Sequence, residues 1–93
     1  MTIARRFIVR GRVQGVGFRY FAIRAARGLG IVGTVCNMPD GSVEAIAEGE
    51  TEAILEFRRD LERGPSYSQV TAVEESELDV TGRYKSFEVV SSQ

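Results

Sequence analysis

The order in which two kinds of apolar pattern follow one another restricts the fold more than any other feature of this chain. Apolar residues recur at helical spacing over residues 19–28. They do so again after Thr51, which is expected to cap a second helix that ends at Gly64-Pro65. Around these two segments apolar and polar residues alternate, as they do in half-buried strands. The chain therefore combines strands with two helices.

The strand-like segments and their order predict the architecture. A turn at Met38-Pro39-Asp40-Gly41 makes a hairpin of the second and third segments. With the two helices the order is βαββαβ, which predicts an α+β fold of the ferredoxin-like kind, a sandwich of one antiparallel sheet with two helices on one face. The strand-like segments are residues 5–13, 31–38, 42–48 and 70–79, followed by a last strand that contains Phe87 and Val89.

The length and composition favour a single small globular domain over residues 1–93. The chain has 43% hydrophobic and 27% charged residues, and its net charge of −1 gives no general attraction for nucleic acid or an anionic membrane. The single cysteine, Cys36, excludes an internal disulfide and suits a reducing compartment. Because we find no signal peptide, membrane-spanning run or repeat that calls for a partner helix, we expect a cytoplasmic monomer.

The run GRVQGVGFR occupies residues 11–19, and the helical pattern starts immediately after it. This arrangement collects free backbone N–H groups, the positive end of a helix dipole and the guanidinium of Arg19 at one point, which suits a phosphate dianion. On its own, the segment is equally compatible with a tight strand-to-helix connection that leaves Arg19 in solvent. It is neither a dinucleotide-binding fingerprint, since Tyr20 replaces the third glycine, nor a Walker A loop.

Asn37 ends the second strand, near the mouth of the expected sheet. Its carboxamide can accept a hydrogen bond from water and donate one to an oxygen at the same time. Taken alone, Asn37 is more simply explained as a turn-promoting residue before Pro39. The nearby carboxylates of Asp40 and Glu44 are interpreted as solvated. The preceding Cys36 should point to the opposite face of the sheet, as a small apolar strand residue.

Together, these segments resemble the two signatures of the acylphosphatase family, and the resemblance covers nearly the whole chain. The run at residues 11–19 matches the first signature without a gap. The run Gly33-Thr34-Val35-Cys36-Asn37 resembles the second, although Thr34 stands where the family usually has an aromatic residue. Two signatures in the right order and separation are more specific than either glycine pattern alone. The second signature continues at the family spacing with Gly41, Val43 and Gly49.

The resemblance implies a complete function. It implies an enzyme that hydrolyses the carboxyl–phosphate bond of a small acyl phosphate to a carboxylate and inorganic phosphate, without a metal or a cofactor. It also implies that Asn37 holds the attacking water. The departure at Thr34 is expected to weaken packing on the outer face of the sheet, because Thr34 and Asn37 alternate to opposite faces. By the same resemblance, the phosphate is bound by Arg19 with the loop residues Gly15, Val16, Gly17 and Phe18.

The absence of histidine supports this chemistry, since it excludes Ser/His and Cys/His nucleophile pairs and histidine-based metal sites. An acyl phosphate releases a carboxylate, which needs little protonation. Its hydrolysis can therefore rest on positioning and charge stabilisation. For the missing general base, our hypothesis is that an oxygen of the substrate phosphate takes the proton from water.

Two other functions fit parts of the sequence. The RNA-recognition motif shares the βαββαβ order, but its aromatic signature lies in the third strand, whereas Gly15-Val16-Gly17-Phe18 precedes the first helix. A non-catalytic regulatory module of the same fold, which binds phosphate without turnover, is the stronger alternative. The presence of both Arg19 and Asn37 argues against it.

Overall fold

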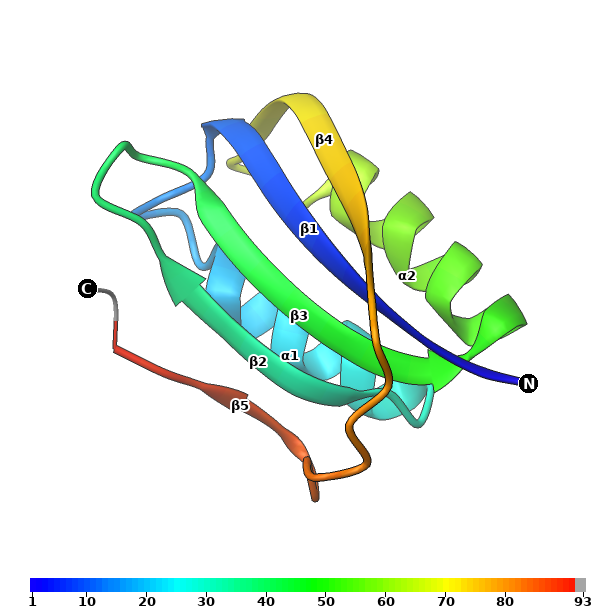
Figure 1. Ribbon diagram of the computed structural model, residues 1–93. Coiled ribbons are helices and arrows are strands. Elements are labelled where there is room, and N and C mark those ends of the chain that lie inside the picture. Colours follow the sequence, from blue (N-terminus) through cyan, green and yellow to red (C-terminus); the bar gives the residue numbers. More distant parts are fainter. Residues whose placement is uncertain (92–93) are drawn as a thin grey trace.

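The computed structural model describes residues 1–91, and its two layers are a five-stranded sheet and a pair of helices packed on one face of it (Figure 1). The ferredoxin-like α+β fold expected from the sequence is confirmed. Residues 92 and 93 of the expected domain lie outside the described residues. The elements are β1 (Thr2–Arg12), α1 (Phe18–Gly28), β2 (Val32–Asn37), β3 (Val43–Glu50), α2 (Thr51–Arg63), β4 (Gln69–Leu78) and β5 (Phe87–Val89).

The strands lie in the order β4-β1-β3-β2-β5, and the first four pair antiparallel as expected. The expectation of an antiparallel sheet fails at β5, which pairs parallel with β2 and makes the sheet mixed. The physical reason is the path of residues 79–86, which cross the face opposite the helices (Figure 1). Strand β4 ends at the same end of the sheet as that at which β2 begins. A segment that crosses the sheet at that end and then turns back into it therefore forms a strand that runs parallel to β2.

The hydrophobic core lies between the sheet and the helices. Phe57 of α2 packs edge-on against Phe7 of β1 and Phe87 of β5, with ring centroids 5.9 and 5.7 Å apart. Each such buried aromatic side chain contributes roughly 1.5–3 kcal/mol. The buried residues of α1 are Phe18 and Ala22 with Ala26, so its N-terminal turn is fixed against the sheet. No helix among the described residues has the length and hydropathy needed to cross a membrane.

The start of α2 differs from the expectation. Glu50 occupies the N-cap position with extended backbone, and Thr51 is already the first helical residue. The reason is that the pairing of β3 with β1 continues through Glu50, which lies opposite Thr2. The Thr51 hydroxyl donates to the carbonyl oxygen of Met1 at 3.1 Å instead of capping the helix. The helix ends at Gly64 as expected.

Candidate active site

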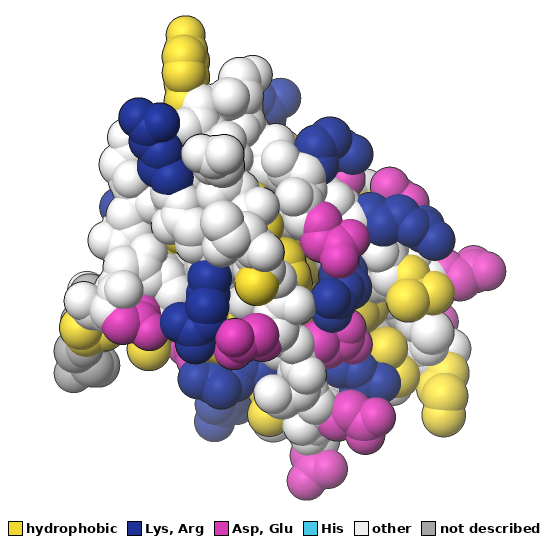
Figure 2. All heavy atoms as spheres, turned by 90° about the horizontal axis from the view of Figure 1, so that it is seen from above, with side chains coloured by type: hydrophobic (Ala, Val, Ile, Leu, Met, Phe, Trp, Pro, Cys, Tyr) yellow, Lys and Arg dark blue, Asp and Glu magenta, His cyan; other side chains and the backbone are white. Residues whose placement is uncertain are grey.

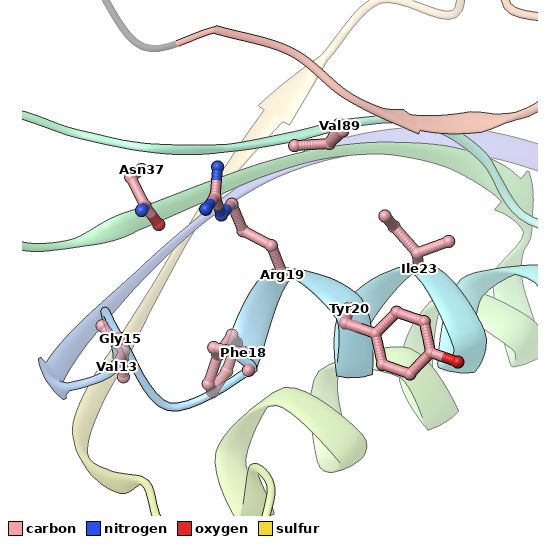
Figure 3. A pocket seen from close by; sticks show the side chains of 9 residues that line it. Val13, Gly15, Phe18, Arg19, Tyr20, Ile23, Asn37 and Val89 are labelled. Carbon is pink, nitrogen blue, oxygen red and sulfur yellow. The ribbon is translucent and has the colours of Figure 1, made fainter.

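A pocket of about 360 Å³ lies between the N-terminal turn of α1, the end of β2 and strand β5 (Figure 3). It brings together Arg19 and Asn37, which come from different elements and which the sequence singles out for different reasons. Gly15, Gly17 and Phe18 of the predicted loop also line it. The remaining lining residues are Val13, Tyr20, Ile23 and Val89.

The loop before α1 owes its shape to two glycines. Gly15 and Gly17 have φ angles of +75° and +78°, in the left-handed region that favours glycine. A Cβ at either position would meet no atom within 4 Å, so the backbone conformation, not crowding, requires glycine there. The turn that they make points the N-terminus of α1 into the pocket.

The first turn of α1 has N–H groups without helical acceptors. The first intrahelical bond runs from the N–H of Phe21 to the carbonyl of Gly17 at 3.0 Å, so the preceding N–H groups have no carbonyl one turn back. Gly17 is the N-cap residue and has no side chain to accept a bond from them, and the first turn contains no acidic residue. An anion in the pocket would therefore meet free donors and the positive end of the helix dipole.

Arg19 extends from the first turn of α1 across the pocket toward Asn37 (Figure 3). Within residues 1–91 it belongs to no ion pair, whereas the sheet arginines Arg6 and Arg10 each contact a carboxylate. An exposed guanidinium at the positive end of a helix therefore has no anion of the described chain beside it. An anion bound in the pocket would neutralise this charge and interact favourably with the helix dipole.

Asn37 is the last residue of β2, and its carboxamide faces the pocket (Figure 3). Val35, two residues earlier on the same face, is fully buried in the core. The core thus fixes the orientation of the strand end, while the Asn37 side chain is left without a hydrogen-bond partner among the described residues. Both of its polar atoms are available to a ligand or to water.

Cys36 lies on the opposite face of the sheet, as expected. Its side chain is 7% exposed and approaches the Glu44 carboxylate at 3.8 Å. Burial, and then the negative charge of Glu44, raise the pKa of the thiol. Thr34 is half-buried and does not line the pocket. The thiol does not line the pocket, and its raised pKa keeps it protonated at neutral pH.

The residues that surround the pocket are not all the ones predicted from the sequence. The side chain of Val16 packs against the core and does not line the pocket, and the ring of Phe18 is buried. Their contribution to a bound anion would come from the backbone. Four lining residues were missed. Val13 precedes the predicted loop, Tyr20 and Ile23 lie off the apolar stripe of α1, and Val89 reaches the pocket through the parallel pairing of β5. No sequence signal indicated that approach.

The two carboxylates nearest to Asn37 in the sequence are engaged elsewhere. Asp40 accepts hydrogen bonds from the backbone and hydroxyl of Ser42 and pairs with Arg10, which lower its pKa to about 2. Glu44 pairs with Arg6 at 2.6 Å. Within residues 1–91, no three acidic or cysteine side chains gather closely enough to hold a metal ion. The pocket thus combines backbone donors, a guanidinium and a carboxamide.

The fold and this pocket define a class of small ferredoxin-like α+β proteins with a ligand pocket at the N-terminus of the first helix. A family model for acylphosphatase matches residues 5–89, and the chain belongs to the acylphosphatase family. Acylphosphatases are hydrolases that act on acid anhydrides, and this chain is an enzyme of that kind. The resemblance seen in the sequence is thereby confirmed.

Individual relatives agree with the family match. An acylphosphatase of Solibacter usitatus is 49% identical over 86 residues, which cover 92% of this chain and 88% of that protein. An acylphosphatase of Synechococcus sp. strain WH7803 is 51% identical over 77 residues, covering 83% and 77%. The crystal structure of the Bacillus subtilis acylphosphatase matches with a TM-score of 0.91 and 39% identity, covering 97% of this chain and 99% of that one.

The same fold also occurs inside a much longer protein. Full-length HypF, solved in a phosphate- and nucleotide-bound form, matches with a TM-score of 0.90 and 33% identity. That match covers 99% of this chain but 12% of HypF. A unit of this kind can therefore be one part of a larger chain.

Proposed function

We propose that this enzyme hydrolyses the carboxyl–phosphate bond of small acyl phosphates, with Arg19 and the loop at residues 15–19 binding the phosphate and Asn37 positioning the attacking water. The observation that carries the proposal is the meeting of Arg19 and Asn37 in one pocket, beside the free N–H groups of α1. No metal or cofactor takes part in the proposed reaction.

The phosphate is held by electrostatic attraction and by directional hydrogen bonds. The N–H groups of the first turn donate to its oxygens along the helix axis, where the dipole favours negative charge. The guanidinium of Arg19 can donate two parallel bonds to the same group. Both interactions strengthen as negative charge shifts within the phosphoryl group during transfer, so they stabilise the transition state more than the ground state.

The water is activated by position. Asn37 accepts a hydrogen bond from water through its oxygen and donates through its NH₂ to a phosphate oxygen, which aligns the water with phosphorus. The water oxygen bonds to phosphorus, the bond from phosphorus to the carboxyl oxygen breaks, and the carboxylate leaves with the electron pair. One water proton passes to a phosphate oxygen. This route needs no general base, in agreement with the engagement of Asp40 and Glu44 in other contacts.

The acyl part of the substrate has an apolar wall available. Tyr20, Ile23 and Val89 line the pocket beside the proposed phosphate position. Tyr20 is 67% and Val89 49% exposed, so this wall is open to solvent and encloses no acyl group of defined shape. A wall of this kind supports hydrolysis of small acyl phosphates with various acyl groups.

We propose that residues 1–93 form one domain that acts as a cytoplasmic monomer, without nucleic acid or membrane as a partner. In support, one core contains the buried residues of both helices. On the face shown in Figure 2, cationic and anionic side chains are interspersed and form no basic stripe of the kind that binds nucleic acid. Light scattering of the purified protein should give the mass of one chain, and the mass of two would contradict the proposal.

The reaction is tested by its products in water labelled with heavy oxygen. With benzoyl phosphate or acetyl phosphate as substrate, the label should enter inorganic phosphate, because the water attacks phosphorus. Glycerol phosphate should not react, since its alkoxide leaving group needs protonation by a general acid, and the described lining contains no carboxylic acid or histidine. Label in the carboxylate, or comparable rates with glycerol phosphate, would contradict the proposed reaction.

A further inference from the structure

The side chain of Gln14 connects the loop that lines the pocket to the turn that follows Asn37. Gln14 belongs to the loop between β1 and α1, directly before Gly15. Its Nε2 donates to the carbonyl oxygens of Met38 at 2.8 Å and of Ser42 at 2.9 Å. Met38 directly follows Asn37 in the chain. One carboxamide therefore joins the proposed phosphate loop to the turn at which the strand of Asn37 ends.

We propose that Gln14 is a positioning residue that sets the placement of Asn37 relative to the phosphate loop. The proposal rests on the roles given above to Arg19 and Asn37. Gln14 does not line the pocket, so it acts on the reaction through Asn37 and not by contact with the substrate.

The turn that receives these bonds is itself well defined. The N–H of Met38 donates to the Ser42 carbonyl at 2.8 Å, and the N–H of Gly41 donates to the Met38 carbonyl at 3.1 Å. The Asp40 carboxylate accepts two further bonds from Ser42. A bond to either carbonyl from outside therefore holds the whole turn.

Other contacts hold this turn to the strand but not to the loop. Arg10 of β1 pairs with Asp40 at 3.2 Å, and Val9 lies opposite Val43 in the sheet. Both contacts precede the loop in the chain. In the described part of the chain, Gln14 is the loop residue whose side chain bonds to the turn. Without these bonds, the distance between the bound phosphate and the attacking water would vary with the motion of the loop.

The two parts of the site should respond differently to this loss. The proposed phosphate donors all lie on residues 15–19 and move as one unit with α1, so phosphate binding should hardly depend on Gln14. The alignment of Asn37, the attacking water and phosphorus involves both segments, so it should depend on Gln14. A misplacement of about 1 Å at a reaction centre can cost on the order of 10² in rate.

A variant without the amide should still fold. Both acceptor carbonyls keep the donors from Met38 and Gly41, so neither is left unsatisfied when the Gln14 side chain loses its N–H groups. Gln14→Met preserves the length of the side chain and removes the donor. Arg58→Met is a matched control, because Arg58 ties α2 to β4 through the Val73 carbonyl at 3.0 Å, away from the pocket.

The test measures kcat with benzoyl phosphate and the competitive inhibition constant of inorganic phosphate. Gln14→Met should lower kcat about 10- to 100-fold and change the inhibition constant less than about threefold. Arg58→Met should leave both unchanged. In an Asn37→Ala background, Gln14→Met should lower kcat less than about twofold further, because the group that it positions is gone.

Three results would overturn the inference. One is a wild-type kcat in Gln14→Met, and another is a full further loss of kcat in the Asn37→Ala background. The third is an inhibition constant that weakens as much as kcat falls, since Gln14 would then support the phosphate loop. A failure of the proposed function looks different: Asn37→Ala would itself keep a wild-type kcat, and the inference would fall with it.

Discussion

At the scale of single residues, Arg19 is in a position that its own helix disfavours. A cation in the first turn of a helix opposes the macrodipole, and in the described chain no carboxylate neutralises it. Such a local conflict is expected at a functional site, where a ligand supplies what the fold does not. The conflict was visible in the sequence because GRVQGVGFR places the arginine two residues after Gly17, where the helical pattern starts.

The shape of the guanidinium should matter as much as its charge. Arg19→Lys should lower kcat/KM about 10- to 100-fold, because a point ammonium cannot make the paired bonds, each worth about 1.5–3 kcal/mol to a charged group. Arg24→Lys on the same helix is the matched control, since Arg24 lies over the ring of Tyr20 and does not itself line this pocket. Steady-state kinetics with benzoyl phosphate measure both. Equal activity of the two variants would refute a bidentate role for Arg19.

Other residues of the site could not be predicted because their roles depend on tertiary approach. Asn37 was found through its place in a signature, but the bonds of Gln14 to the turn depend on two loops that meet in space. Tyr20 and Val89 reach the pocket for the same reason, one from the flank of α1 and one from a strand with parallel pairing. Apolar periodicity identifies residues that face the core and says little about the rim of a pocket.

At the scale of elements, the crossing segment between β4 and β5 is held by one buried carboxylate. Glu48 of β3 is 3% exposed and accepts bonds from the N–H and hydroxyl of Thr81, at 2.9 and 2.8 Å, and from the N–H of Gly82 at 3.1 Å. The alternating pattern of β3 did not indicate it, because a glutamate on the outer face of a strand usually faces water. The contact fixes the path that makes β5 parallel to β2.

This contact should make stability depend on pH. Burial opposes ionisation of Glu48, but the bonds from Thr81 and Gly82 outweigh it and hold the pKa below its ordinary value of 4.5. Because the unfolded chain then binds more protons, the contribution is complete above about pH 4.5 and is lost as the pH falls through the lower folded pKa. The unfolding free energy should therefore fall as the pH is lowered from about 5 toward 2.

Glu48→Gln isolates that contribution. It should reduce the unfolding free energy at neutral pH by about 1–3 kcal/mol, because the amide presents N–H groups to donors of Thr81 and Gly82. It should also flatten the pH dependence below pH 5. Glu77→Gln, at an exposed position on β4, is the control and should change neither. Urea unfolding at several pH values measures both effects, and an unchanged pH slope in Glu48→Gln would contradict the assignment.

At the scale of the whole molecule, the family and the fold were accessible from the sequence while parts of the connectivity were not. Two signatures at the right separation identified the family, and the order of strand and helix patterns gave the sandwich. The direction of β5 follows from the path of residues 79–86, which have no apolar period, and the first residue of α2 follows from the length of the β1–β3 pairing. Neither is a local property of the sequence.

The complete enzyme should work without a metal ion. The proposed phosphate ligands are backbone N–H groups and a guanidinium, which bind an anion without an intermediary cation. Prolonged treatment with EDTA, followed by assay with benzoyl phosphate in chelator-treated buffer, should leave kcat and KM unchanged. Loss of activity that Mg²⁺ or Zn²⁺ restores would contradict the proposed mechanism.

In the proposed mechanism, phosphate binding and water positioning reside in two different side chains. The kinetics of Arg19→Ala, Asn37→Ala and the double variant test this division of roles most directly. The measurements are kcat with benzoyl phosphate and the inhibition constant of inorganic phosphate. Asn37→Ala should lower kcat by about 10²–10³, as loss of one well-placed hydrogen-bonding group does, while phosphate still binds. Arg19→Ala should lower kcat and weaken phosphate binding together. The loss of kcat in the double variant should be much smaller than the two single losses combined. An Asn37→Ala enzyme with wild-type kcat would contradict the proposed role of Asn37 and leave it as a turn residue before Pro39.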